Sequence, residues 1–309
     1  MKGPLFYAKI LLFGEYGIIK DSKGLSIPYN FYRGALKIPK QFDSKQAESN
    51  KKLQAFTTYL KGIDPAIVTF DWLRLQADLD RKIYFDSTIP QGYGVGSSGA
   101  LVASIYDQYA FDKITVLENL TKEKLQQLKQ IFSSMESFFH GKSSGLDPLN
   151  SYLSLPILIH SKQQIETTGI PSQNLDGKGA VFLLDSGIIG ETAPMVSLFM
   201  ENMKQESFST MMKEQFIKTS DHCVEDFLKG NFKSLFGNIK SLSSLVLHNF
   251  EPMIPKPFQD IWKKGLETNA YYLKLCGSGG GGFILGFTED FQKAKDVLKD
   301  YPLEVVYHF

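Results

Sequence analysis

The sequence is poor in cysteine, with only Cys223 and Cys276 among 309 residues. A disulfide framework or a cysteine-rich metal site needs more than two cysteines, so neither is expected. Long apolar runs are also missing, because none reaches the ~18 residues of a membrane-spanning helix. The first residues lead straight into a strand-like run and show no small-residue cleavage pattern of a secretory signal. Together these absences predict a cytoplasmic protein that makes no contact with a membrane.

An excess of charge of one sign is absent as well, since 34 Lys and Arg residues balance 33 Asp and Glu residues. Proteins that bind nucleic acid usually carry a basic stripe, so nucleic acid is not an expected partner. The chain instead has the composition of an ordinary globular protein, with 43% hydrophobic and 22% charged residues. Its length is sufficient for two domains.

The N-terminal half predicts an α+β arrangement. An apolar run at the start carries a single lysine, Lys9, and is typical of a buried strand. A glycine-rich segment at 90–99 is followed by apolar residues at helical spacing. The predicted elements of this half are strands within 5–13, 26–38 and 66–86, and helices over 43–61, from 100 onward and over 122–139.

A polar stretch with glycine and proline, residues 160–179, is typical of a boundary between domains. We therefore expect an N-terminal domain at 1–168 and a C-terminal domain at 169–309. The predicted elements of the C-terminal domain are a strand at 180–184, helices over 195–247 and 256–270, two strands around a glycine loop within 271–287, a helix at 289–299 and a strand at 303–309.

The glycines of the segment at 90–99 favour close approach of a ligand to the backbone. Ser97 and Ser98 open the helix that follows, where free N–H groups and the helix dipole favour phosphate. A serine hydroxyl at that place can also reach a Mg²⁺ ion bound to the phosphates. The segment therefore predicts a phosphate-binding loop, and a tight turn that binds no ligand is the alternative.

Other phosphate loops fit this segment less well. Gly94, Gly96 and Gly99 match the spacing of a dinucleotide fingerprint, but the next element is a second helix where that fold has a strand. A Walker loop needs a lysine that is missing here, and the wider signature of protein kinases is also missing. A dinucleotide-dependent oxidoreductase therefore remains only as a rival interpretation.

Two carboxylates follow the loop, and each alone is an ordinary surface group. Glu136 lies at the edge of the apolar stripe of the helix at 122–139. Asp147 precedes a proline, which disfavours the helical conformation, so we expect an extended residue there. Near a phosphate site, Glu136 is a candidate Mg²⁺ ligand and Asp147 a candidate contact to a substrate hydroxyl. His140 is interpreted as a histidine that faces the end of the helix dipole.

Three motifs in order carry a resemblance to a known family: Lys9-Ile-Leu-Leu-Phe-Gly-Glu15-Tyr16, Pro90-Gln-Gly-Tyr-Gly-Val-Gly-Ser-Ser-Gly-Ala100 and Lys274-Leu-Cys-Gly-Ser-Gly-Gly-Gly-Gly-Phe283. The chain resembles the GHMP family of small-molecule kinases over most of its length. This resemblance implies an α+β, two-domain fold with an N-terminal domain like domain 2 of ribosomal protein S5 and a ferredoxin-like C-terminal domain. It also implies transfer of the γ-phosphate of ATP, with Mg²⁺, to a hydroxyl of a small metabolite.

The resemblance implies a role for each matching residue. Asp147 orients or deprotonates the acceptor hydroxyl, and Lys9 contacts the reacting centre. Ser98 and Glu136 hold Mg²⁺. The residues implied in binding ATP are Gly92, Gly94, Val95, Gly96, Ser97, Ser98, Gly277, Gly279 and Gly280, and those implied on the acceptor side are Glu15, Tyr16, Ser144 and Gly145.

Within the family the chain most resembles mevalonate kinase, through the run from His140 to Asp147. The expected acceptor is therefore mevalonate. Tyr16 departs from the histidine usual in mevalonate kinases and is similar to phosphomevalonate kinases, so phosphomevalonate or the acceptor of another GHMP kinase stays open. Ser143, Cys276 and Gly99 are smaller departures, from proline, threonine and alanine. A non-catalytic nucleotide-binding homologue is a further alternative, and a homodimer is also left open.

Overall fold

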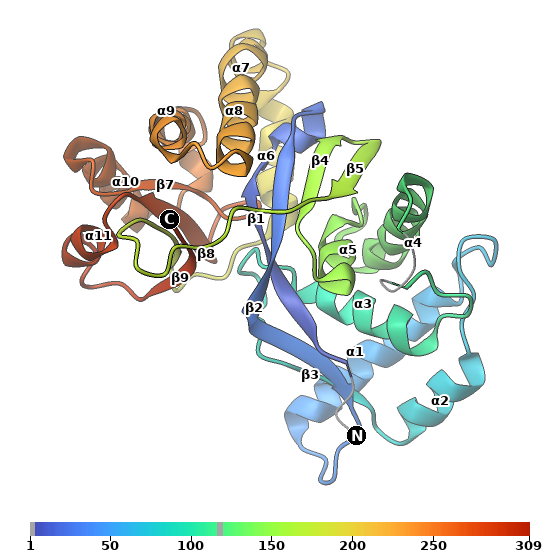
Figure 1. Cartoon of the computed structure of the whole chain (residues 1–309). Helices are drawn as coiled ribbons and strands as arrows, with labels where there is room; N and C mark the ends of the chain where they lie inside the picture. The colour runs from blue at the N-terminus through green and yellow to red at the C-terminus, as the bar shows by residue number, and fades with distance from the viewer. Residues whose placement is uncertain (1–3, 116–119) are drawn as a thin grey trace. The chain divides into compact units, whose positions relative to one another are not determined.

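The computed structural model describes residues 4–115 and 120–309 (Figure 1). The chain divides into two compact units. The first contains the N-terminal stretch to Lys9, residues 27–90 and residues 96–155. The second contains residues 10–26, 91–95 and 156–309. Within the described residues, every helix falls short of the length or apolar character needed to cross a bilayer.

The first unit packs helices beside a small antiparallel sheet. In it β2 (Gly24–Lys37) pairs with β1 (Phe6–Phe13) and, over Gly34–Lys37, antiparallel with β3 (Tyr84–Ser87). Helices α3, α4 and α5 contact one another, and their apolar faces form much of this unit's core. The helices of this unit are α1 (Ser44–Leu60), α2 (Trp72–Asp80), α3 (Ser97–Tyr109), α4 (Lys122–His140) and α5 (Leu146–Leu153).

Most predicted elements of this unit are confirmed, but the strand-like interpretation of residues 66–86 is wrong for its middle part. That part forms helix α2, which Asp71 caps by accepting a hydrogen bond from the Arg74 N–H at 3.0 Å. Leu75 and Leu79 are both buried because they lie one helical turn apart on the same face. Ahead of α2, only a single bridge, Phe70 to Ala110, remains of the expected pairing.

The second unit contains a four-stranded antiparallel sheet of order β7-β8-β6-β9. Its central strands β6 (Ala180–Asp185) and β8 (Phe283–Thr288) are almost wholly buried, as expected for apolar strands covered on both faces. The flanking strands are β7 (Tyr272–Leu275) and β9 (Leu303–His308). Its helices are α6 (Thr192–Asn202), α7 (Glu206–Met211), α8 (Ile217–Leu228), α9 (Phe232–Asn249), α10 (Lys256–Thr268) and α11 (Phe291–Val297), with short helical turns at Gly17–Lys20, Met212–Phe216 and Glu251–Met253.

A hairpin that the sequence analysis missed also belongs to the second unit. Its strands β4 (Ile157–Ser161) and β5 (Gln164–Thr167) pair antiparallel, and β4 pairs with the beginning of β2 from Gly24 to Ser26. The segment 160–179, expected to be an irregular boundary, therefore begins as a strand. Its mixed polar sequence gives little of the period-two pattern by which a strand is recognised.

The expected extended conformation of Asp147 is also wrong. Asp147 lies in the first turn of α5, which begins at Leu146 after Gly145. A proline is tolerated in a first helical turn, where its missing N–H has no intrahelical partner to lose. The preference of a residue before proline for extended backbone is therefore outweighed at Asp147 by the helix start. One consequence is that the carboxylate sits at the positive end of the helix dipole.

At Gly99, α3 lies directly against the backbone of α5. A Cβ added there would lie 2.7 Å from both the Asp147 carbonyl carbon and the Pro148 nitrogen. Backbone atoms of a helix cannot move aside as a flexible side chain can. The glycine at this position therefore permits α5 to carry Asp147 close to α3.

Gly99→Ala is expected to lower the free energy of unfolding by about 1–3 kcal/mol, because overpacking outweighs the helix propensity gained. The matched control is Gly237→Ala, since Gly237 lies exposed within α9 with no atom near an added Cβ. That control should raise the free energy of unfolding by up to ~1 kcal/mol. Urea unfolding of both variants measures the difference, and equal stabilisation would mean that α3 and α5 can separate at Gly99 without cost.

Candidate active site

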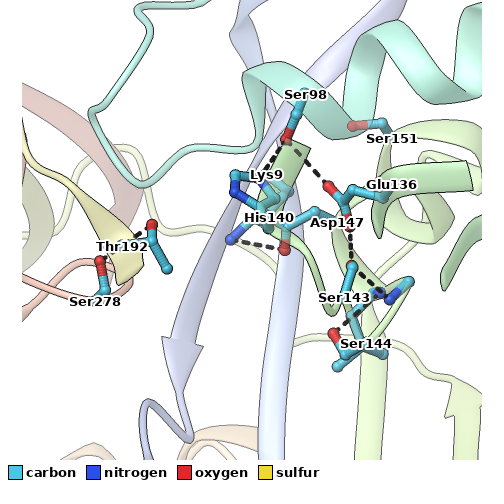
Figure 2. Close-up of polar contacts among 12 residues, drawn as sticks. Lys9, Ser98, Glu136, His140, Ser143, Ser144, Asp147, Ser151, Thr192 and Ser278 are labelled. Carbon is cyan, nitrogen blue, oxygen red and sulfur yellow. Dashed lines mark hydrogen bonds and ion pairs between the residues drawn. The ribbon is translucent and has the colours of Figure 1, made fainter. Parts of the chain in front are cut away.

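Lys9 and Asp147 form an ion pair in the first unit, with 3.0 Å between Nζ and Oδ1 (Figure 2). The Lys9 side chain is 6% exposed, whereas that of Asp147 is 37% exposed. A buried ammonium group needs a counter-charge, and Asp147 supplies it while keeping one side open to solvent. Ser151, one turn further along α5, donates to the Tyr7 carbonyl oxygen at 2.8 Å. That bond ties α5 to β1 and so holds the pair in register.

Helix α3 begins beside this ion pair. Gly96 precedes its first residue with φ of 81°, and a Cβ added there would lie 3.0 Å from Lys9 Cγ and 3.6 Å from Asp147 Oδ2. No side chain caps this helix start, so the N–H groups of Ser97 and Ser98 are not used by a cap. Such an uncapped start beside a lysine suits a phosphate group, as the sequence predicted.

Glu136 is buried, only 3% exposed, although its place at the edge of an apolar stripe suggested a surface group. Its Oε1 accepts a hydrogen bond from Ser98 Oγ at 3.1 Å, and its Oε2 accepts one from Ser143 Oγ. Burial, and then the negative charge of Asp147, raise the pKa of Glu136 to about 8. The carboxyl group is therefore mostly protonated at neutral pH when no cation is present.

The donors at Glu136 and Ser98 fit a Mg²⁺ ion that arrives with a nucleotide. Both are hard oxygen donors, which Mg²⁺ prefers, and Mg²⁺ in nucleotide sites is held by one or two carboxylates plus phosphates and water. Among the described residues, no group of three or more His, Cys, Asp or Glu side chains is placed to hold a metal. The protein therefore offers part of a coordination shell, and phosphate oxygens would complete it.

Two residues of this cluster were missed as functional by the sequence analysis. His140 Nε2 lies 3.1 Å from Ser98 Oγ, and Ser143 is bound to Glu136. His140 was interpreted as a histidine that only faces the helix dipole. Its position one turn after Glu136 on α4 was the available signal, because residues four apart share a helix face. Nothing comparable pointed to Ser143, which lies in the loop after the helix.

Ser144 and Gly145, predicted on the acceptor side, shape the turn into α5. Ser144 Oγ accepts a hydrogen bond from the Leu146 N–H at 3.4 Å. Gly145 has φ of 73°, and a Cβ added there would lie 2.2 Å from the Lys129 carbonyl oxygen on α4. This turn is therefore pressed against α4, and it directs the start of α5 that bears Asp147.

The other predicted nucleotide residues lie in the second unit, where two glycine loops meet. A Cβ added at Gly94 would lie 2.3 Å from the Cys276 carbonyl oxygen, and one added at Gly277 would lie 3.2 Å from Gly94 Cα. Val95 is buried beside them. Glycine is therefore required here by contact between the two loops as well as by any ligand.

A third segment, residues 186–191, joins these loops and was not singled out from the sequence. Gly190 N–H donates to the Gly92 carbonyl oxygen at 3.0 Å, and Gly282 N–H donates to the Ile188 carbonyl oxygen at 2.6 Å. Gly279 and Gly280 have φ of 76° and 77°, and the Gly280 N–H donates to the Met253 carbonyl oxygen at 2.7 Å. Backbone hydrogen bonds thus hold the predicted nucleotide loops of this unit.

Glu15 and Tyr16, predicted on the acceptor side, are buried in the second unit. Glu15 pairs with Lys274, and the two side chains are 6% and 4% exposed. The Tyr16 hydroxyl donates to the Ser278 carbonyl oxygen at 2.5 Å. The partner of Glu15 thus lies on β7, and the partner of Tyr16 lies in the glycine loop that follows β7.

Comparison with known families agrees with the three motifs. Residues 66–154 match the model of the GHMP kinases N terminal domain, and residues 223–305 match that of the GHMP kinases C terminal. The chain belongs to the GHMP kinase family. The predicted family and the predicted two-domain α+β fold are thereby confirmed. A search of curated proteins found no match.

Solved structures of other GHMP kinases share the fold. Mevalonate kinase of L. major in complex with R-mevalonate superposes with a TM-score of 0.60 at 17% identity, covering 97% of this chain and 93% of that one. Galactokinase of Lactococcus lactis complexed with galactose gives 0.64 at 11% identity, covering 98% and 92%. Phosphomevalonate kinase of Streptococcus pneumoniae in complex with phosphomevalonate and AMPPNP gives 0.61 at 14% identity, covering 98% of both. These likenesses concern small-molecule kinases with different acceptors.

Because the pKa of Glu136 is raised, we expect this GHMP kinase to release a proton when a cation binds at Glu136. The ordinary pKa of a glutamate is 4.5. Between pH 4.5 and about pH 8, Glu136 of the folded protein without metal therefore holds a proton that the unfolded chain has lost. Binding of a cation at Glu136 below pH 8 must release that proton, and release should fade above pH 8. Titration of Mg²⁺ with a non-hydrolysable ATP analogue, in buffers of different ionisation enthalpy at pH 7 and pH 9, measures it.

Glu136→Gln is the control for this experiment, because the amide cannot titrate. The variant should lose the extra proton released at pH 7 and should need more Mg²⁺, as should Ser98→Ala. The same linkage predicts that the metal-free wild type becomes less stable as pH rises from 4.5 to about 8, since its folded state binds more protons. Identical binding enthalpies in all buffers at pH 7 would contradict the assignment of Glu136.

Proposed function

We propose that this GHMP kinase transfers the γ-phosphate of ATP to a hydroxyl of a small metabolite, with mevalonate as the expected acceptor. The observation that carries the proposal is the Lys9–Asp147 pair, placed beside the uncapped start of α3 at Gly96. A carboxylate that is partly exposed and paired with a buried ammonium group is suited to contact with a hydroxyl nucleophile. The adjacent helix start is suited to phosphate.

The reaction requires positioning and charge neutralisation more than covalent help. Asp147 accepts a hydrogen bond from the acceptor hydroxyl and takes its proton as the oxygen bonds to the γ-phosphorus and the bond to the β-phosphate oxygen breaks. Lys9, which lies 3.0 Å from Asp147, neutralises charge that develops on the transferred group. Ser98 and Glu136 would hold Mg²⁺, which would neutralise the charge of the phosphates.

A second candidate acceptor is phosphomevalonate. The sequence Gly14-Glu15-Tyr16 in the first motif is similar to phosphomevalonate kinases, which favours it. Both candidates use the same nucleotide and the same transfer step. They differ only in the acceptor, so a single assay separates them.

ADP release by the purified protein with Mg-ATP is the test, with mevalonate, phosphomevalonate, galactose, homoserine or no acceptor added. Release with mevalonate alone is the expected result. Release with phosphomevalonate or another acceptor would keep the transfer chemistry and replace the acceptor. No release with any acceptor, while the protein binds Mg-ATP, would favour a nucleotide-binding homologue without kinase activity on these compounds.

A further inference from the structure

Tyr16 joins the first motif to the third within the second unit. Its hydroxyl donates to the Ser278 carbonyl oxygen at 2.5 Å, and the residue is only 6% exposed. Its ring packs against Phe199 and Phe250, with centroid distances of 4.7 Å and 5.6 Å. The hydroxyl is thereby directed at the glycine loop, and the ring is enclosed by apolar side chains.

The backbone of Tyr16 is held in an uncommon conformation. Its φ is 59° and its ψ is −37°, outside the regions that side-chain-bearing residues normally occupy. The bond from the Gly17 N–H to the Glu15 carbonyl oxygen, 2.6 Å long, closes a tight turn around it. Such conformations persist only when the surroundings hold them, and they concentrate at functional sites. This backbone conformation directs the Tyr16 ring toward Phe199 and Phe250.

The neighbour of Tyr16 is anchored to the same loop. Glu15 pairs with Lys274 on β7, and Lys274 Nζ also donates to the Leu275 carbonyl oxygen at 2.9 Å. Residues 15 and 16 therefore fix both sides of the bend that leaves β7, at Lys274 and at Ser278. The loop they hold is in close contact with Gly94. A Cβ added at Gly94 would lie 2.3 Å from the Cys276 carbonyl oxygen, and one added at Gly277 would lie 3.2 Å from Gly94 Cα.

We propose that Tyr16 is a positioning residue for the glycine loop 277–282, and through that loop for the nucleotide, and that it does not contact the acceptor. This inference rests on the proposed function, because it takes Mg-ATP as the ligand of the loop. Burial and the negative charge of Glu15 raise the pKa of the Tyr16 hydroxyl, so it remains a donor at any working pH.

Tyr16→Phe is the test, because it removes the bond to Ser278 and keeps the ring. The matched control is Tyr271→Phe, since Tyr271 is also buried in the second unit and donates to the Ile261 carbonyl oxygen at 2.9 Å. Calorimetric titration with Mg²⁺ and a non-hydrolysable ATP analogue should show binding weakened about fivefold in Tyr16→Phe, within the range of couplings through positioning residues. Tyr271→Phe should bind as the wild type does, with a similar loss of melting temperature.

The acceptor supplies the second measurement. If Tyr16 acts through the glycine loop, the KM of the acceptor in Tyr16→Phe stays within about twofold of the wild type. Loss of a hydrogen bond between Tyr16 and the acceptor would raise that KM by more than about twofold. A raised acceptor KM with unchanged binding of the analogue would overturn the proposal and place Tyr16 in the acceptor site. Equal analogue binding by both tyrosine variants would also overturn it. A wild type that binds no analogue would instead contradict the proposed function itself.

Discussion

Asp147→Asn is expected to lower kcat by about 10²–10⁴-fold, the usual contribution of a positioned general base. Asparagine has nearly the same shape, so it preserves the turn into α5 but cannot take the proton of the acceptor hydroxyl. Binding of a non-hydrolysable ATP analogue should change little, because the phosphate-binding groups at the start of α3 remain. Steady-state kinetics with the active acceptor and calorimetric binding of the analogue measure the two quantities separately.

Stability must be controlled in this experiment, because the variant leaves the buried ammonium group of Lys9 without its counter-charge. Asp78→Asn is the matched control. Asp78 is a buried carboxylate of the first unit, and it accepts a hydrogen bond from the Tyr109 hydroxyl at 2.9 Å. That control should lose stability yet keep kcat. If Asp147→Asn loses ATP affinity as much as turnover, Asp147 organises the nucleotide site and is not the base.

The same variant should also change the titration of Glu136. The negative charge of Asp147 is one cause of the raised pKa of Glu136, so its removal should lower that pKa. Less proton release on binding of Mg²⁺ and the analogue at pH 7 is then expected than in the wild type. This readout does not depend on turnover, and it tests whether the two carboxylates interact as the structure indicates.

Lys9 and Asp147, the proposed catalytic pair, could be singled out from the sequence because both lie in recognisable segments. Lys9 stands in an apolar strand where a charged residue is unusual, and Asp147 follows a serine- and glycine-rich turn. What the sequence could not reveal is the conformation that brings them together. The proline after Asp147 argued for extended backbone, and the contact of α5 with α3 at Gly99 outweighed that local preference.

Burial was harder to predict than secondary structure. The pattern of α4 placed Glu136 at the edge of the apolar stripe, and periodicity cannot tell which neighbours cover an edge. In the structure Ser98, from α3, and Ser143, from the loop after α4, both bind it. Tyr16 shows the same limit, because its partner Ser278 lies in a motif at the other end of the chain. Contacts of this kind arise from tertiary structure alone.

Lys9→Met is expected to lower kcat/KM by about 10²–10³-fold, the usual cost of removing one group that stabilises developing charge. Methionine fills nearly the same space in β1, so the core should stay packed. The remaining Asp147 carboxylate is 37% exposed, and water can therefore solvate it. Initial rates at varied Mg-ATP and acceptor, with thermal melting of the same samples, separate the loss of activity from any loss of stability.

Lys37→Met is the matched control, because it removes a lysine from an exposed ion pair with Asp86 in the same unit. It should leave kcat/KM unchanged. Lys9→Arg should fail to restore activity, since the guanidinium group is broader than an ammonium group and the Lys9 side chain already lies against Gly96. A tenfold loss of kcat/KM corresponds to ~1.4 kcal/mol of transition-state stabilisation. If Lys9→Met retains more than about a third of the wild-type kcat/KM, Lys9 has only a structural role. The proton transfer assigned to Asp147 would then not depend on the positive charge of Lys9.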